Sequence, residues 1–494
     1  MLELIVFLCG AVVMVLELVG SRVLAPYLGT SIVVWTSLIG IILGSLSIGY
    51  WYGGKLADRN PTDRAFAGII LLSAVLVGAV TFLKSPVLDF LQNAVSSFSI
   101  NAILATIILF APPSITLGMV SPYAVRLRMR DLTTSGATVG RLYAISTIGS
   151  IAGTFLAGFY LIAYFGSTKI LLILAGTLVL TSALAFSRGF LAARAVLTAL
   201  IVLSFFVVGF TEQMQERQGI YSVDTRYSHV TVHPSIDEST GRRTLAMVTN
   251  PRETQSAMYL DNPADLVLRY TRFYRLVHHF RPDTRTALMI GGAGFSYPKN
   301  YLVSFPHARL DVVEIDPDFT RLAREHFVLR EDARLTVYHE DGRTYLNRTT
   351  AKYDVVFGDA FSSLYSVPYQ LTTRETVQRI YQTLNDRGVV LMNIISSIEG
   401  ETGEFLRAEY ATFKSVFPQV YLFPVGNPED GSDVQNVMLV ALKDTAVPSF
   451  HSADPELKRY LSHRWTKQIP DDMPILTDDH APVDTYMLKV IRTL

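Results

Sequence analysis

Seven long apolar runs fill the first 211 residues, and they constrain the fold of this chain more than any other feature. They lie at about 2–26, 31–54, 65–83, 99–120, 139–165, 168–186 and 191–211. A helix needs roughly 20 apolar residues to cross the hydrocarbon core of a bilayer. The first run lacks the basic start of a signal peptide and further runs follow it, so we do not expect it to be cleaved. The sequence predicts a transmembrane domain over 1–212.

Lysine and arginine residues beside the short loops predict the orientation of these helices, because such residues concentrate on the cytoplasmic side. The loops after the second, fourth and sixth runs hold Lys55, Arg59, Arg64, Arg126, Arg128, Arg130, Arg141, Arg188 and Arg194. The alternate loops hold only Lys84 and Lys169. The N-terminus is therefore expected in the cytoplasm.

Charge and cysteine content narrow the classes of function. The 43 basic and 43 acidic residues cancel, so the composition gives no indication of a nucleic-acid partner. The single cysteine, Cys9, excludes an intrachain disulfide and a metal cluster built on cysteines. We expect no metal and a small-molecule substrate.

The remaining residues have the composition of a soluble protein and divide into two parts. Over 213–280, short β-rich pieces such as "YSHVTVHP" and "RRTLAMVTN" predict a small antiparallel sheet, and "PADLVLRYTRFYRLVHHF" predicts a linking helix. Over 281–494, apolar strands alternate with amphipathic helices, from "TALMIGG" to "NVMLVAL". This alternation predicts a doubly wound, mostly parallel sheet.

Successive strands of that sheet are predicted to end in acidic residues, after a glycine-rich first loop, "IGGAG". Glu314 ends the second strand, where a carboxylate can accept hydrogen bonds from both ribose hydroxyls. Asp341 ends the third strand, and Asp359 ends the fourth. The spacing favours a Rossmann-like class I S-adenosylmethionine-binding domain, with Asp341 accepting from the adenine amino group. An NAD site is the alternative, although no glycine array for a diphosphate is present. For Glu314 and Asp341, a solvated acid at a strand end is the alternative.

Five motifs, in this order along the chain, resemble those of the polyamine aminopropyltransferases, the spermidine synthases. They are "ETQSAMYL", "ALMIGGAGFSYPKNYL", "DVVEIDP", "HEDGRTYL" and "YDVVFGDAF" followed by "VPYQLTTRE". Together with the apolar first half and the late motif "LTDDHAPVD", the whole chain is similar to the membrane-fused spermidine-synthase-like proteins of bacteria. The resemblance implies a multi-pass protein of the bacterial inner membrane and a possible homodimer.

The same resemblance implies roles for individual residues. The donor, S-adenosylmethionine or its decarboxylated form, would be bound by Gln255, Gly291, Gly292, Gly294, Glu314, Asp341 and Gly342. Asp359 matches the catalytic acid, which accepts a proton from the attacking amine or orients that amine. Two acids of the family are missing, since Gly294 and Ser362 stand where it has aspartates that bind ammonium groups. Without them, recognition of a diamine is in doubt.

Aromatic and titratable residues near these motifs are further candidates. Tyr270 and Tyr274 are candidates to hold the transferred chain or its amine, although helical aromatics also build cores. His480, in "TDDHAP", is a candidate second acid or base, with a capped turn as the alternative. An apolar wall of Phe361, Tyr365 and Tyr369 would raise the pKa of Asp359 by desolvation.

Three kinds of function follow from these residues. The first is transfer of the three-carbon chain of the donor to an amine, which releases methylthioadenosine. The second is a lyase or cyclase that cleaves the donor without an external acceptor. The third is a transporter or sensor with a regulatory nucleotide-binding domain.

Because seven crossings from a cytoplasmic N-terminus would place the catalytic domain outside the cell, we expect that one run does not cross or that one span is missed.

Overall fold

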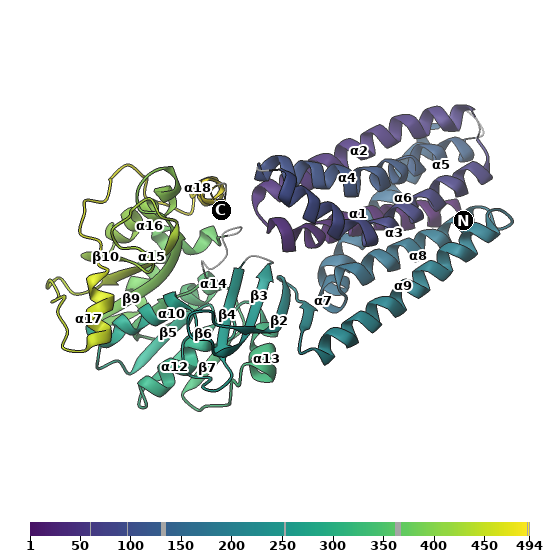
Figure 1. Ribbon diagram of the computed structural model, residues 1–494. Helices are drawn as coiled ribbons and strands as arrows, with labels where there is room; N and C mark the ends of the chain where they lie inside the picture. The colour runs from purple at the N-terminus through teal and green to yellow at the C-terminus, as the bar shows by residue number, and fades with distance from the viewer. Residues whose placement is uncertain are drawn as a thin grey trace. The chain divides into compact units, whose positions relative to one another are not determined.

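The chain divides into two compact units, Met1–Val230 and Thr231–Leu494, each of which is described by itself (Figure 1). The computed structural model describes residues 1–59, 61–95, 97–129, 135–250, 253–360, 367–491 and 493. The finer division expected from the sequence, at 212 and 280, stays a prediction.

The first unit is helical and ends in one short strand. Its elements are α1 (Leu2–Leu28), α2 (Ile32–Arg59), α3 (Asp63–Ala94), α4 (Phe98–Gly118), α5 (Val120–Arg128), α6 (Ser135–Leu156), the π-helical turn η2 (Ala157–Leu161), α7 (Ile162–Tyr164), α8 (Ser167–Ala185), α9 (Leu191–Arg217) and β1 (Tyr221–Asp224). The described residues include seven helical segments long and apolar enough to cross a membrane, and they coincide with the seven predicted runs. Whether these segments cross a membrane stays a prediction.

Small residues let neighbouring helices of this unit approach closely. A Cβ atom on Gly149 of α6 would lie 2.1 Å from the carbonyl oxygen of Phe7 in α1, and one on Gly153 would lie 2.5 Å from that of Ala11. Such contacts between backbones are typical of helices that pack in a bilayer, where small residues replace the hydrophobic effect as the source of tight packing.

The second unit begins with the small sheet that the sequence predicts. Strands β2 (His229–Ile236), β3 (Arg243–Asn250) and β4 (Glu253–Tyr259) pair in antiparallel order. The predicted linking helix is wrong in its first half, because helix begins only at Arg269. Before it, Asn262 and Asp265 form a hydrogen-bonded turn, and Leu266 pairs with Met258 as an isolated β-bridge.

A seven-stranded sheet forms the centre of the second unit, in the order β10-β11-β9-β8-β5-β6-β7. Its strands are β5 (Thr286–Ile290), β6 (Arg309–Val313), β7 (Leu335–Tyr338), β8 (Tyr353–Gly358), β9 (Leu384–Ser396), β10 (Gln419–Pro424) and β11 (Gln435–Leu442). The five strands from β5 to β9 are parallel, and β10 and β11 add to one edge in antiparallel pairing. The mostly parallel sheet predicted from the alternation is confirmed.

Helices flank this sheet, as Figure 1 shows. They are α10 (Arg269–Phe273), the turn η3 (Tyr274–Leu276), α11 (Val277–Phe280), α12 (Ser296–Ser304), α13 (Pro317–His326), α14 (Gly342–Arg348), η4 (Tyr369–Leu371), α15 (Arg374–Thr383), η5 (Glu401–Gly403), α16 (Glu404–Lys414), α17 (Pro455–Ser462) and α18 (Val483–Ile491). Every residue of β8 is buried, as expected for a central parallel strand covered on both faces.

The strand order reverses between β5 and β8. From β5 the chain proceeds outward to β6 and β7, and it then returns to place β8 and β9 on the other side of β5. In open α/β sheets, ligands bind beyond the carboxyl ends of the strands at such a switch point. The candidate site is therefore located by topology before any side chain is considered.

Candidate functional site

Asp359 lies at the switch point, directly after β8. Its backbone N–H donates to the carbonyl oxygen of Ile290 (2.9 Å), which ties the ends of β8 and β5 together. Gly291 follows Ile290 with a φ of +95°, and a Cβ atom there would lie 2.7 Å from the carbonyl oxygen of Asp359. Glycine is needed at 291 for both reasons, because side chains rarely adopt this conformation and none fits the space.

The carboxylate of Asp359 has one bound and one unbound oxygen. Oδ2 accepts a hydrogen bond from the Tyr270 hydroxyl (3.2 Å), whereas Oδ1 is buried and has no partner among the described residues. Tyr274 instead donates to the carbonyl oxygen of Gly358 (2.8 Å) and so holds the strand end. Burial raises the pKa of Asp359 to about 7, and the Tyr270 hydroxyl opposes that rise. The carboxylate is therefore suited to accept a proton near neutral pH.

A cavity of about 210 Å³ opens in front of Asp359. The loop after β5, the ends of β6 and β7 and the segment around η4 form its walls. Its lining includes Gln255, Gly291, Gly292, Glu314, Asp341, Gly342, Asp359 and Gln370. Seven of these eight residues are site residues expected from the sequence, so the structure brings most of the predicted site together.

Glu314 shapes the glycine-rich loop as well as lining this cavity. One carboxylate oxygen accepts from the backbone N–H groups of Gly292 (2.8 Å) and Ala293 (3.0 Å), and the other accepts from that of Asp316 (3.0 Å). Burial raises the pKa of Glu314, and these backbone N–H groups oppose the rise. A carboxylate has about four acceptor positions and three are occupied, so one remains for a hydroxyl donor from a ligand.

Asp341 caps helix α14 at the opposite wall. Its Oδ1 accepts from the backbone N–H of Thr344 (3.0 Å), and its Oδ2 accepts from the side-chain amide of Gln370 (3.2 Å). A Cβ atom on the neighbouring Gly342 would lie 2.7 Å from a methyl group of Ile290, so a larger residue would displace the cavity wall. The carboxylate of Asp341 thus lies at the edge of the closely packed wall that Gly342 and Ile290 form.

A second, much smaller cavity lies on the other side of Asp359. Its volume is about 10 Å³, close to the space of a single water molecule. Gln255, Gly292 and Asp359 line both cavities, and Tyr270 lines the smaller one. Asp359 therefore separates an enclosure large enough for much of a nucleoside from a narrow space beside its own carboxylate.

Three predicted residues line neither cavity: Tyr274, whose hydroxyl donates to Gly358 and not into a cavity, Gly294 and His480. Gly294 lines neither cavity but packs against β4, where a Cβ atom would lie 2.6 Å from the hydroxyl oxygen of Ser256. His480 also lines neither cavity, and its backbone closes a hydrogen-bonded turn with Thr477. For His480 the structure shows the capped turn that the sequence left open as an alternative.

The motif that contains His480 contacts residues that hold the segment around Gln370 in place. Asp478 forms an ion pair with Arg343 (2.7 Å) and accepts a hydrogen bond from the Thr373 hydroxyl (2.6 Å). Arg343 also donates to the carbonyl oxygen of Gln370 (3.4 Å). These bonds anchor the segment that carries Gln370 into the cavity lining.

The sequence reasoning overlooked two residues near Asp359. Gln370 lies within the "VPYQLTT" motif, so the motif itself could have identified it. Asn393 is a fully buried amide in the apolar strand β9, and the amide of Asn436 donates to its side-chain oxygen (3.0 Å). Asn393 could have been identified from the sequence, because a polar residue is unusual inside a buried parallel strand. The amide of Asn393 is a further influence that lowers the pKa of Asp359.

The predicted apolar wall around Asp359 is only partly described. Phe361 and Tyr365, as well as Ser362, lie outside the described residues. Tyr369 is described, but it is 55% exposed and does not line the cavity, so its predicted place in the wall is wrong. The buried surroundings of Asp359 come instead from Tyr270 and the neighbouring strand ends.

We expect the substitution Tyr270→Phe to move the pH profile of kcat toward higher pH. The base must be deprotonated to act, so activity should rise with pH through the pKa of Asp359, near 7. The phenol hydrogen bond stabilises the charged carboxylate, and its loss should raise that pKa by about one unit. Tyr301→Phe is the matched control, because the buried Tyr301 hydroxyl lies 3.3 Å from that of Thr284 instead. Identical profiles for wild type and Tyr270→Phe would contradict this assignment.

The sheet order and the acids at the switch point define the class of the second unit. It is a Rossmann-like domain of the class I methyltransferase type. Residues 273–487 match the model of the spermine/spermidine synthase domain family. The family resemblance expected from the sequence is confirmed.

Individual relatives agree with this assignment. The chain is 28% identical over 246 residues to the polyamine aminopropyltransferase of Vibrio vulnificus, which covers 49% of this chain and 77% of the relative. It is 30% identical over 227 residues to a probable polyamine aminopropyl transferase of Bifidobacterium longum. That alignment covers 42% of this chain and half of the relative. A solved structure of a probable spermidine synthase from Corynebacterium glutamicum is similar over 47% of this chain and 83% of that one, with 20% identity and a TM-score of 0.40.

Proposed function

We propose that this protein transfers the aminopropyl group of decarboxylated S-adenosylmethionine to an amine and releases methylthioadenosine. The observation that carries the proposal is the unpartnered Oδ1 of Asp359, which is buried between a nucleoside-sized cavity and a narrow second one. The relatives' names and the matched family support the same reaction. Glu314 would bind the ribose and Asp341 the adenine.

The reaction requires the protein to position the two reactants and to supply one base. The nitrogen lone pair of the acceptor attacks the aminopropyl carbon next to sulfur, so that a C–N bond forms as the C–S bond breaks. The electron pair of the C–S bond goes to sulfur, which converts the sulfonium into the thioether of methylthioadenosine. Asp359 accepts the proton that the nitrogen loses. Alignment of the two reactants accounts for much of the rate.

The charges around the cavities favour the decarboxylated donor over intact S-adenosylmethionine. Among the described residues, the linings of both cavities contain acids but no lysine, arginine or histidine. The carboxylate of the intact donor would therefore lie near Asp359 without a cationic partner, which is costly in a buried site. An aminopropyl chain carries only an ammonium group, which Asp359 attracts.

Cleavage of the donor without an acceptor is a second candidate. The small volume of the second cavity, about 10 Å³, favours it, because little room is left there for an incoming amine. In that reaction Asp359 would remove a proton from the donor itself.

Mass spectrometry of the purified full-length protein distinguishes these reactions. With decarboxylated S-adenosylmethionine, methylthioadenosine that forms only when an amine is added, together with the aminopropylated amine, is the expected result. Methylthioadenosine without added amine would instead establish cleavage. S-adenosylhomocysteine from the intact donor would show methyl transfer, and tight binding without any product would contradict an enzymatic role.

We also propose that an even number of helical segments of the first unit cross the bacterial inner membrane, so that the N-terminus and the second unit both lie in the cytoplasm. Large apolar side chains on the outside of the helices support this, such as Phe159 (75% exposed) and Phe206 (72% exposed), since water-exposed apolar surface of this kind is rare. In a Cys9→Ser background, the substitution Val447→Cys places one thiol on an exposed site of the second unit. Labelling of whole cells by a membrane-impermeant maleimide would contradict the cytoplasmic location.

A further inference from the structure

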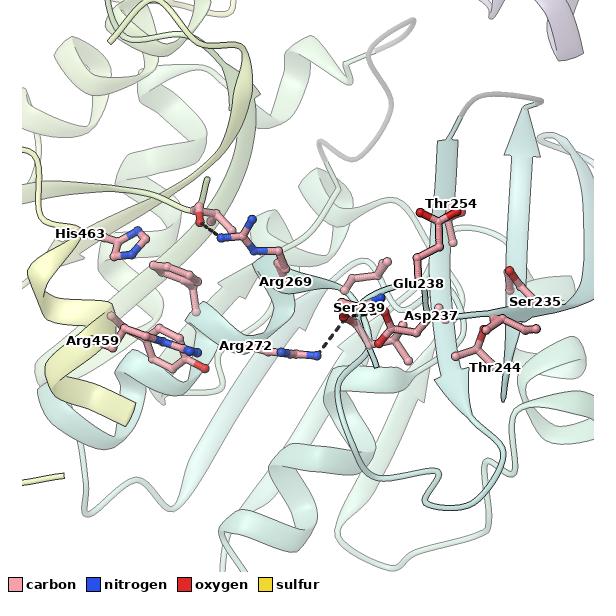
Figure 2. Close-up of a pocket in the computed structure, with 18 residues that line it drawn as sticks. Ser235, Asp237, Glu238, Ser239, Thr244, Thr254, Arg269, Arg272, Arg459 and His463 are labelled. Atoms are coloured by element: carbon pink, nitrogen blue, oxygen red, sulfur yellow. Dashed lines mark hydrogen bonds between the residues drawn. The ribbon is translucent and has the colours of Figure 1, made fainter. Parts of the chain in front are cut away.

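A third and larger cleft in the second unit has a basic wall that the proposed reaction does not use. Its volume is about 660 Å³, and it lies between the small antiparallel sheet and helices α10 and α17 (Figure 2). Arg269, Arg272 and Arg459 line it, together with His463. Figure 2 shows these four side chains on the helical side of the cleft. We call this space the basic cleft.

The three guanidinium groups retain part of their hydrogen-bonding capacity, although Arg272 also donates to the Tyr259 hydroxyl (3.5 Å). Arg269 donates to the carbonyl oxygen of Val425 (3.1 Å), and Arg272 donates to backbone carbonyl oxygens at 3.0 and 3.3 Å. Arg459 lies 5.2 Å from the centre of the Tyr460 ring. Within the described part of the chain, none of the three forms an ion pair with a carboxylate. Each guanidinium has five N–H donors in a planar fork, so several remain available to an anion.

The acids on the opposite wall offset this charge only in part. Asp237 accepts hydrogen bonds from Ser239, Thr240 and the Tyr259 hydroxyl, so its carboxylate is engaged by its own turn and by β4. Glu238, next to it, is exposed. Three arginines therefore face two carboxylates, and that of Asp237 already accepts hydrogen bonds from neighbouring residues. The helical side of the cleft stays positively charged.

The basic cleft adjoins the space beside Asp359. Ala257 and Leu268 line both the cleft and the smaller cavity. On α10, Arg269 lines the cleft, whereas the next residue, Tyr270, donates to Asp359. A molecule seated in the cleft can thus extend a narrow chain toward the catalytic carboxylate. The small volume of the cavity, about 10 Å³, excludes a ring, so the part of the molecule nearest the carboxylate must be unbranched.

We propose that the basic cleft binds the anionic end of the acceptor, which is an unbranched amine that also carries a carboxylate or phosphate group. The inference rests on the proposed aminopropyl transfer and names the class of its acceptor. The amine would reach Asp359, and the guanidinium groups would bind the opposite end in the bidentate manner that suits both anions. An aliphatic polyamine would bring a second cation to a wall of like charge, which is unfavourable.

Acceptors of matched length test this proposal in the full-length protein. 1,4-Diaminobutane, 5-aminopentanoate and 4-aminobutyl phosphate share one amine and four methylene groups but differ at the other end. We expect at least one of the two anionic acceptors to have a KM about tenfold lower than that of the diamine. The two anionic compounds separate carboxylate from phosphate recognition. A lower KM for 1,4-diaminobutane than for both of them would overturn the proposal.

The substitution Arg459→Gln should affect the two kinds of acceptor in opposite directions. Loss of one charge-assisted hydrogen bond should raise KM for the preferred anionic acceptor about tenfold, and loss of a repulsive charge should lower KM for the diamine. Arg459→Lys should restore part of the anion preference. Lys458→Gln is the matched control, because Lys458 is exposed on the same helix but does not line the cleft. Equal effects of Arg459→Gln on both acceptors would also overturn the proposal.

A binding measurement separates this inference from the proposed function. Calorimetry with 5-aminopentanoate and with 4-aminobutyl phosphate, in the presence of methylthioadenosine, requires no turnover. If no amine is converted but one of these anions binds and Arg459→Gln weakens it tenfold, the anion site is supported while aminopropyl transfer fails. If an amine is converted but neither anion depends on Arg459, the transfer stands and the anion site is refuted.

Discussion

Replacing Asp359 by asparagine should reduce kcat by about a thousandfold while methylthioadenosine still binds. Asparagine keeps the size of the side chain but cannot accept a proton, and a positioned base typically contributes a factor of 10² to 10⁴. Other residues form most of the nucleoside-sized cavity, so the affinity of the variant for methylthioadenosine should change little. Product formation measured by mass spectrometry and binding measured by calorimetry test the two halves of this expectation. Turnover at the wild-type rate would remove Asp359 from the mechanism.

The same variant should be more stable than the wild type at alkaline pH. The pKa of Asp359 in the folded chain, about 7, lies above its ordinary value of 3.8, so the folded state holds the proton more tightly. The stability that this group contributes is fully present below pH 4 and is lost as the pH rises through 7. Asparagine does not ionise, so the advantage in melting temperature of Asp359→Asn should grow between pH 5 and pH 8. An advantage that does not change with pH would contradict the raised pKa.

Replacing Glu314 by alanine should weaken the binding of methylthioadenosine by about 100-fold. A hydrogen bond from a ribose hydroxyl to a buried carboxylate would be lost, and such a bond is worth about 1.5–3 kcal/mol. The backbone N–H groups of Gly292 and Ala293 would also lose their acceptor, which loosens the loop that lines the cavity. Glu325→Ala is the control, because Glu325 lies on the surface of α13, where its carboxylate pairs with Arg321.

The 2′-deoxy analogue of methylthioadenosine separates the contact with ribose from the effect on the loop. In the wild type, removal of the 2′-hydroxyl should reduce affinity, whereas in Glu314→Ala the two ligands should bind equally. If the variant still distinguishes the two ligands as strongly as the wild type, Glu314 only supports the loop and the ribose assignment is wrong.

Much of the fold could be predicted from the sequence because its signals are local and repeated. Seven apolar runs became seven helices, and the alternation after residue 281 became a mostly parallel sheet. The linking helix was misplaced at its start because the competing interaction involves a residue outside the segment. Leu266 pairs with Met258 of the preceding strand β4, and no helical pattern within the segment reveals that partner.

The candidate site could be predicted where a residue ends a strand, since topology alone brings such ends together. Glu314, Asp341 and Asp359 all line one cavity for this reason. Gly294 was misjudged because its environment depends on packing with a distant segment, whereas the sequence left the local turn at His480 open as an alternative. The space beside Gly294 is taken by Ser256 of β4, and the sequence near Gly294 does not record that contact.

The ion pair between Asp478 and Arg343 has a consequence for synthesis of the chain. A ribosome makes the N-terminus first, and the segment that carries Gln370 is anchored through Arg343 to residues made more than 100 positions later. In the same region the N–H of Arg374 donates to the carbonyl oxygen of Leu476 (2.8 Å). Helices and most of the sheet can thus form during translation, whereas the candidate cavity is completed only after residue 478 has left the ribosome.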